Sequence, residues 1–117
     1  MEGDLLPKLA SGFGGGIGRK GSLCGALTGS VMAVGMRFGR TDPNDREAVL
    51  MVYQTCQDVW NWFEQEMGNV NCHELIGIHI DNEEERQRWL AQGGPEKCAG
   101  IVEKTAEWLS RVLEKTS

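Results

Sequence analysis

Three of the four cysteines occupy the same kind of position in the sequence. Cys24, Cys72 and Cys98 each fall at the predicted start of a helix. Free amide donors and the positive end of the helix dipole stabilise a thiolate there, and the thiolate is the form that attacks disulfides and binds metals. We therefore expect these three residues to form one cluster of candidate catalytic residues and metal ligands. Burial as small apolar side chains is the competing interpretation for each.

The fourth cysteine and the two histidines are weaker candidates. Cys56 lies in the middle of a predicted helix, between Tyr53 and Trp60 on an apolar stripe, and is predicted to be a small core residue. His73 adjoins Cys72 and is a secondary candidate ligand, whereas His79 is expected at the surface. The cysteine spacing is too wide for a zinc-ribbon or ferredoxin pattern, so the spacing by itself does not identify a metal. An iron–sulfur cluster and zinc are both candidate cofactors.

A glycine-rich stretch leads into Cys24. The segment "GIGRKG", Gly16 to Gly21, has the letters of a G-x-G-x-x-G fingerprint. That fingerprint signifies dinucleotide binding only after a strand and within a βαβ unit, and the preceding residues show no strand pattern. Nucleotide or phosphate binding is thus the least favoured alternative. We predict a compact loop with several positive φ angles that houses Cys24.

The elements that must position these residues are helical. Helical spacing and breaker residues predict helices over 5–10, 23–38, 43–67, 72–77, a polar stretch within 81–94, and 95–115. Ser22 is the expected cap of the second helix, and Asp42 with Pro43 the expected start of the third. The expected fold is a single all-α domain over 1–117, a small bundle around a central, buried helix rich in glycine and alanine.

Composition narrows the classes of function. The chain has 117 residues and a formal net charge of −5, which argues against a nucleic-acid partner. Its longest nearly apolar run, 23–36, is too short and too polar to span a bilayer, so direct membrane insertion is not expected. The acidic start does not resemble a signal peptide, which predicts a cytoplasmic protein with reduced thiols.

Two motifs together resemble a known family. "FGGGIGRKGSLCGALTGSVMAVGMRFGR", followed by "NCHELIG" and a cysteine that opens the last helix, is similar to proteins named for a C…GCAxxG…C…C cysteine pattern. The central element stands here as "CGALTG", from Cys24 to Gly29. The resemblance covers most of the chain. It implies a small helical redox-active protein, commonly encoded near transporters, and a similar domain occurs in a multihaem cytochrome with an iron–sulfur centre.

The chain also departs from that family pattern. The family has a further cysteine in a helix upstream of the glycine loop, and this sequence contains none there. Either the site is a shortened one, or Cys56 has taken the fourth role. Gly25 and Gly29 are candidate cofactor-binding positions, because small residues there are expected to let another segment approach closely, such as the start of the last helix with Cys98.

Two functions of different class follow. The first is electron transfer or thiol–disulfide exchange by Cys24, Cys72 and Cys98, with a redox partner or a membrane transporter component as the implied partner. The second is a non-catalytic helical adaptor or oligomerisation module with packing cysteines. Trp60 and Trp62 cannot share one helix face, which leaves one of them for an interface such as a homo-oligomer contact.

Overall fold

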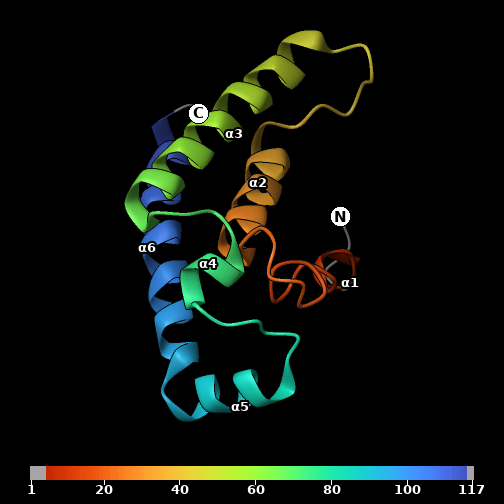
Figure 1. Cartoon of the computed structure of the whole chain (residues 1–117). Helices are drawn as coiled ribbons and strands as arrows, with labels where there is room; N and C mark the ends of the chain where they lie inside the picture. Colours follow the sequence, from red (N-terminus) through yellow and green to blue (C-terminus); the bar gives the residue numbers. More distant parts are fainter. Residues whose placement is uncertain (1–4, 116–117) are drawn as a thin grey trace.

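The fold is all-α, as expected from the sequence. A computed structural model describes residues 5–115, and Figure 1 shows the arrangement of its helices. The helices are α1 (Leu5–Ala10), α2 (Gly25–Phe38), α3 (Arg46–Met67), α4 (Cys72–Ile76), α5 (Glu83–Ala91) and α6 (Gly94–Lys115). Over this range the only β-type pairing is a single antiparallel bridge between Leu23 and Asn71.

The hydrophobic core lies where α2, α3 and α6 pack together. Its members share nearly complete burial: Leu27, Val34, Val59, Phe63, Val70, Leu75 and Leu109. On the α3–α6 side the core is extended by Trp62 and Trp108, whose rings stack with centroids 4.6 Å apart and an interplanar angle of 8°. Each helix contributes one apolar stripe, which is the usual way in which amphipathic helices form a bundle.

Helix α2 is central but is buried on one side only. Leu27, Ser30 and Val34 are buried, whereas Gly25, Gly29 and Met36 are exposed. The prediction of a buried central helix is therefore wrong for half of its circumference, because α3 and α6 cover one side and leave the opposite side to solvent. The hydroxyl of Ser30 is satisfied inside the helix, where it donates to the carbonyl of Ala26 at 2.7 Å.

Two helix starts differ from the expected ones. Helix α2 begins at Gly25, with Cys24 in an extended conformation as its N-cap residue, so Ser22 does not cap it. Helix α3 begins at Arg46, where the carboxylate of Asp45 accepts from the amide of Ala48 at 3.1 Å. Asp42 instead accepts from the amide of Asn44 and closes a turn before the helix. At α3 a neighbouring aspartate caps the helix in place of the predicted one, whereas at α2 the N-cap residue Cys24 makes no side-chain capping hydrogen bond.

The expected helix ends are confirmed. Helix α2 stops before Gly39, and α3 stops at Gly68, whose left-handed φ of 88° suits glycine. Helix α4 ends in the same way at Gly77, with a φ of 74°. The turn at Gly68 returns the chain from α3 to the beginning of α2, where Asn71 pairs with Leu23.

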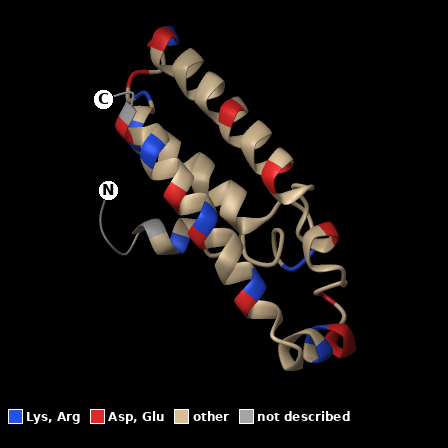
Figure 2. Ribbon diagram, turned by 90° about the vertical axis from the view of Figure 1, so that its left-hand side faces the viewer, with Lys and Arg blue, Asp and Glu red and all other residues tan. Residues whose placement is uncertain are grey.

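Helix α5 and the start of α6 form the far end of the molecule (Figure 1). Helix α5 is capped by Asn82, contains no buried residue, and carries charges of both signs (Figure 2). Helix α6 begins at Gly94, one residue before the predicted Pro95. Gly94 is buried beneath the ring of Trp89, where a Cβ would overlap the indole. Among the described residues, no helix is both long enough and apolar enough to span a membrane.

Candidate redox site

The bridge between Leu23 and Asn71 brings the first two cysteines together. The amide of Cys24 donates to the carbonyl of Val70 at 2.8 Å, and the amide of Cys72 donates to the carbonyl of Ser22 at 2.6 Å. Cys24 and Cys72 therefore stand diagonally across one short antiparallel pairing, with both side chains on the same face of it. Segments far apart in the sequence are held here by backbone hydrogen bonds.

Cys98 joins this pair from the start of α6. The ammonium of Lys97 donates to the carbonyl of Leu75 at 2.8 Å, which fastens the beginning of α6 to the end of α4. Cys24 and Cys98 both contribute to the pKa of Cys72, and Cys24 contributes to the pKa of Cys98. The three thiols therefore lie within electrostatic range of one another. Thus the structure brings together the three cysteines that the sequence singled out.

The pKa directions differ from the expected ones. Burial raises the pKa of the Cys72 thiol, and the neighbouring Cys24 and Cys98 raise it further. Burial and Cys24 also raise the pKa of Cys98, while the cation of Lys97 lowers it. The predicted helix-start stabilisation is therefore wrong for these two thiols: desolvation and like charge outweigh it. Helix α4 has only five residues, so its dipole is small. Cys98 is the fifth residue of α6, beyond the first turn where the dipole acts most strongly.

Cys56 lies apart from this cluster. It is half-buried on α3, packs against the core, and lines a shallow surface pocket with Trp60. Burial alone raises the pKa of its thiol, without any contribution from another cysteine. The prediction of a core residue is right about its packing, but its burial is only partial.

The glycine loop over residues 12–22 is a left-handed coil. A run of five residues has φ between 58° and 71°: Gly15, Gly16, Ile17, Gly18 and Arg19. Six successive amides, from Ile17 to Ser22, donate to carbonyls within the loop. Left-handed backbone is unfavourable for a β-branched residue such as Ile17, so the loop stores strain that its own hydrogen bonds and packing offset. The predicted compact loop is confirmed.

This loop covers the start of α4. A Cβ placed on Gly16 would lie 2.7 Å from the Cβ of Cys72, and one on Gly21 would lie 2.9 Å from the Cβ of His73. The amide of His73 also donates to the carbonyl of Gly21 at 3.0 Å. The loop therefore houses Cys72 and His73 directly. Cys24 follows the loop, as predicted, at the start of α2.

The same hydrogen bonds weigh against a phosphate-binding loop. An anion-binding loop presents free backbone amides to its ligand. Here the amides from Ile17 to Ser22 already have carbonyl acceptors, and the loop follows a short helix where a dinucleotide fingerprint would follow a strand. The alternative of nucleotide binding gains no support from the geometry.

An imidazole pair borders the site, and no sequence pattern predicts it. The rings of His73 and His79 stack with centroids 4.0 Å apart and an interplanar angle of 16°. The Nδ1 of His73 lies 2.8 Å from the carbonyl oxygen of Ile78, so this nitrogen carries the proton and donates. The sharp turn at Gly77 makes the stack possible, because it folds His79 back over α4.

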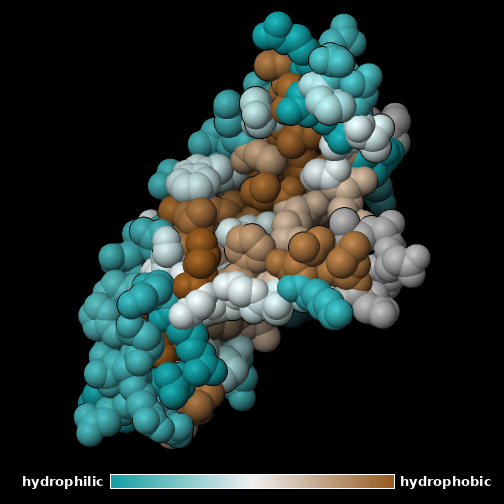
Figure 3. All heavy atoms as spheres, turned by 90° about the vertical axis from the view of Figure 1, so that its right-hand side faces the viewer, coloured by the Kyte–Doolittle hydropathy of each residue, from teal (hydrophilic) through white to brown (hydrophobic). Residues whose placement is uncertain are grey.

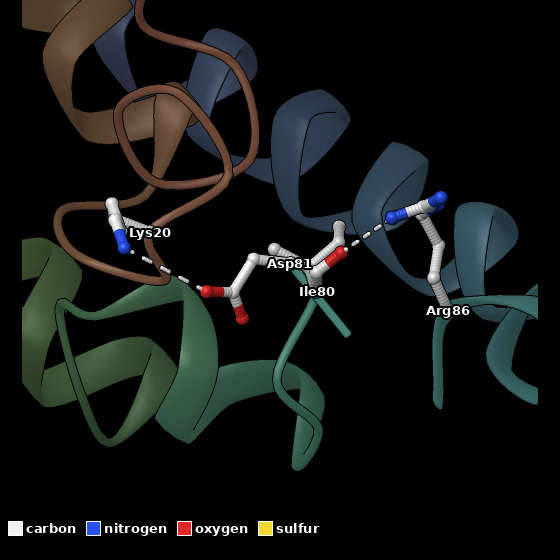
Figure 4. Close-up of polar contacts among 4 residues, drawn as sticks. All are labelled: Lys20, Ile80, Asp81 and Arg86. Carbon is white, nitrogen blue, oxygen red and sulfur yellow. Dashed lines mark hydrogen bonds and ion pairs between the residues drawn. The ribbon is translucent and has the colours of Figure 1, made fainter. Parts of the chain in front are cut away.

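Two polar contacts hold the segment around His79 in place (Figure 4). Lys20 on the glycine loop lies 3.9 Å from the carboxylate of Asp81, and Arg86 on α5 donates to the carbonyl of Ile80 at 3.0 Å. The ion pair is largely exposed and contributes little to stability by itself. Together the two contacts tie the loop, the 77–82 turn and α5 to one side of the site.

Gly25 and Gly29 do not serve the expected close approach. A Cβ on either residue would meet no other atom within 4 Å, apart from the backbone of α2 itself. The prediction that the start of α6 packs tightly on these glycines is therefore wrong. They face a groove between α2 and α6, where the two helices are far enough apart to leave open space.

The thiols do not form a ready metal centre. Within residues 5–115, no three His, Cys, Asp or Glu side chains are grouped closely enough to hold a metal ion. An iron–sulfur cluster or zinc ion on Cys24, Cys72 and Cys98 thus stays a prediction.

Comparison with known proteins gives one family. A family model described as "Putative redox-active protein (C_GCAxxG_C_C)" matches residues 1–112. An uncharacterised protein of Archaeoglobus fulgidus is 32% identical over 109 residues, a match that covers 87% of this chain and 66% of the archaeal protein. The chain thus spans slightly less than two thirds of that relative. No solved structure matches.

Proposed function

Because the chain belongs to the C_GCAxxG_C_C family, described as redox-active, we propose that it carries out thiol–disulfide exchange with Cys24, Cys72 and Cys98. The observation that supports this most is the pair of backbone hydrogen bonds that seats Cys24 beside Cys72. A disulfide needs Cα atoms within about 7 Å and Cβ atoms that point toward each other, and the antiparallel bridge places Cys24 and Cys72 on the same face of two paired segments.

The three thiols have different roles in this proposal. Cys24 is the attacking residue, because it is half-exposed and reaches an external disulfide more easily than the buried Cys72. Cys72 is the resolving residue: burial keeps it from external reagents, while the bridge keeps it next to Cys24. Cys98 is a second resolving thiol; burial and Cys24 raise its pKa, and the ammonium of Lys97 offsets part of that rise.

The exchange proceeds in two balanced steps. The Cys24 thiolate attacks one sulfur of a partner's disulfide, a mixed disulfide forms, and the other partner sulfur leaves as a thiolate. The Cys72 thiolate then attacks the Cys24 sulfur, which forms the internal disulfide and releases the second partner thiolate. The protein loses two electrons and two protons, and the partner gains them. The partner class is therefore a protein or small molecule that carries a disulfide.

The proposal is tested by redox titration and mass spectrometry. Reduced protein is equilibrated with dithiothreitol buffers of stepped potential, and free thiols are then alkylated. We expect one two-electron transition in which Cys24 and Cys72 lose their labels together. Cys24→Ser should abolish it, Cys72→Ser should leave at most a transition in which Cys24 and Cys98 lose their labels together, and Cys56→Ser is the matched control that leaves it unchanged. A transition that survives in both site variants would contradict the proposal.

The same preparation tests the metal prediction. Iron, zinc and labile sulfide are measured on anaerobically purified protein before any reducing agent is added. Thiol–disulfide exchange by free thiols predicts less than stoichiometric metal in the wild-type protein. Stoichiometric metal that is lost in Cys24→Ser but kept in Cys56→Ser would replace the exchange mechanism with a metal centre held by the same residues.

A further inference from the structure

The outer face of α2 is apolar and uncovered. Opposite the buried Leu27 and Val34, helical spacing places Gly25, Gly29, Met32 and Met36 in one stripe. Met36 is 64% exposed, Met32 is half-buried, and no charged residue occurs in α2 before Arg37. Figure 3 shows this side of the molecule, where a hydrophobic band crosses the middle and extends upward, with hydrophilic residues at both ends. A helix that is apolar all round is normally buried on all sides.

The protomer exposes more surface than a compact monomer of the same mass. The molecule exposes 7824 Å², whereas a compact monomer of 12.9 kDa is expected to expose about 6,300 Å². Its radius of gyration is 15.5 Å, against about 13.4 Å for a compact domain of this length. The excess is larger than the ~800 Å² that each partner buries in a standard stable interface. The protomer therefore exposes more surface than a compact monomer by more than one standard interface, and an uncovered face of α2 contributes to that excess.

The stripe is also complementary to itself. Its first half offers glycines, whose absent side chains leave hollows beside a groove that α6 lines with Val102 and Ala106. Its second half offers methionines, which are long, flexible side chains suited to filling irregular hollows. A two-fold axis reverses one copy of the helix against the other, so each methionine end meets a glycine end.

We propose that the chain forms a homodimer in which α2 packs antiparallel against α2 of a second copy. The spacing fixes the register, with the axis between Ser30 and Val31. Met36 of each copy lies over Gly25 of the other, and Met32 lies over Gly29. A second copy is the occupant because the same stripe supplies both the protruding side chains and the hollows. No charge on the stripe opposes this like-to-like contact.

Sedimentation of reduced protein across a concentration series tests the dimer. We expect the wild-type chain to sediment as a dimer at about 10 µM and above, with Met36→Lys weakening association at least ~10-fold because it buries two unpaired ammonium groups. The matched control is Leu90→Lys, an exposed leucine on α5 at the far end of the molecule, which should not change association. Thermal unfolding checks that both variants fold.

A charge pair tests the register. Gly25→Glu combined with Met36→Lys puts a carboxylate opposite each ammonium group across the axis, and should restore most of the association that Met36→Lys loses. Glutamate is tolerated at residue 25 because it begins α2, where the helix dipole favours an acid. A wild-type chain that stays monomeric, or equal effects of Met36→Lys and Leu90→Lys, would overturn the dimer. Failure of the double variant to recover would overturn the antiparallel register.

Discussion

Gly16 lies against Cys72 so closely that a methyl group on Gly16 would sit 2.7 Å from the Cβ of Cys72. The residue also has a φ of 71°, so it meets two separate demands: left-handed backbone and absence of a side chain. Glycine is the one residue that satisfies both at low cost. The contact explains why a glycine loop and a cysteine more than fifty residues away belong to the same site.

Replacing Gly16 should therefore damage the site more than replacing its neighbours. Gly16→Ala is expected to lower the free energy of unfolding by about 2–4 kcal/mol, through strained φ and overpacking against Cys72 and the backbone of Gly21 and Ser22. Gly18→Ala isolates the φ term, because its Cβ meets nothing within 4 Å, and should cost about 1–2 kcal/mol. Gly12→Ala has neither problem and is the neutral control. Urea unfolding measures all three, and equal losses for Gly16 and Gly18 would exclude the contact with Cys72.

Stability should fall as the pH rises above about 8.5. Folding raises the pKa of Cys72 and Cys98, so the folded chain holds these protons more tightly than the unfolded chain. The contribution is complete below the unfolded pKa and is lost as pH rises through the folded one. Urea unfolding of reduced protein from about pH 7 to pH 10 measures this loss. A variant with serine at both positions should have a flatter profile, and identical profiles would contradict the pKa directions.

Gly29→Ala should stabilise the protomer. The glycine is exposed within α2, and a Cβ there meets no atom beyond its own helix, so alanine gains helix propensity of about 0.5–1 kcal/mol without a clash. We place the change in the Met36→Lys background, where dimer dissociation does not enter the unfolding free energy. Thermal and urea unfolding measure the gain. A loss of stability would mean that another segment does pack closely on Gly29.

Cys56→Ala should affect stability and leave the redox transition unchanged. The side chain packs partly against the core, and removing its sulfur should cost roughly 1 kcal/mol or less of unfolding free energy. The potential of the Cys24–Cys72 couple is expected to match that of the wild-type protein, because no charge coupling links Cys56 to them. A shifted or missing transition would give Cys56 the role of the absent upstream cysteine.

The helices were predictable because strong local signals set them. Glycine and asparagine mark the ends of α3 and α4, and one apolar stripe marks α3. The start of α3 was misplaced because two aspartates compete as caps, and only the folded chain shows that Asp45 reaches the amide of Ala48. The covering of α2 could not be predicted either, since an apolar sequence does not reveal which side its neighbours reach.

The site could be predicted by residue type but not by environment. The position of Cys72 after Asn71 identified it as a candidate, yet its pKa depends on burial and on Cys24 and Cys98, which are distant in sequence. The stack of His73 on His79 depends on the turn at Gly77, and no spacing rule indicates such a contact. The close packing assigned to Gly25 and Gly29 was wrong because the small-residue spacing that suggests it also fits an uncovered face.

The coil from Gly15 to Arg19 has positive φ angles throughout, so its backbone conformation is left-handed where most residues are right-handed. Its backbone angles are those that a D-amino acid adopts without strain, so at Gly18 the mirror-image residue is the natural fit. A chain assembled by chemical ligation at Cys24 could carry D-alanine at this position. We expect D-alanine at Gly18 to raise the midpoint of thermal unfolding by restricting the unfolded chain, where L-alanine lowers it. The glycines of this loop thus act as stand-ins for residues of the opposite hand, which ribosomal synthesis does not supply.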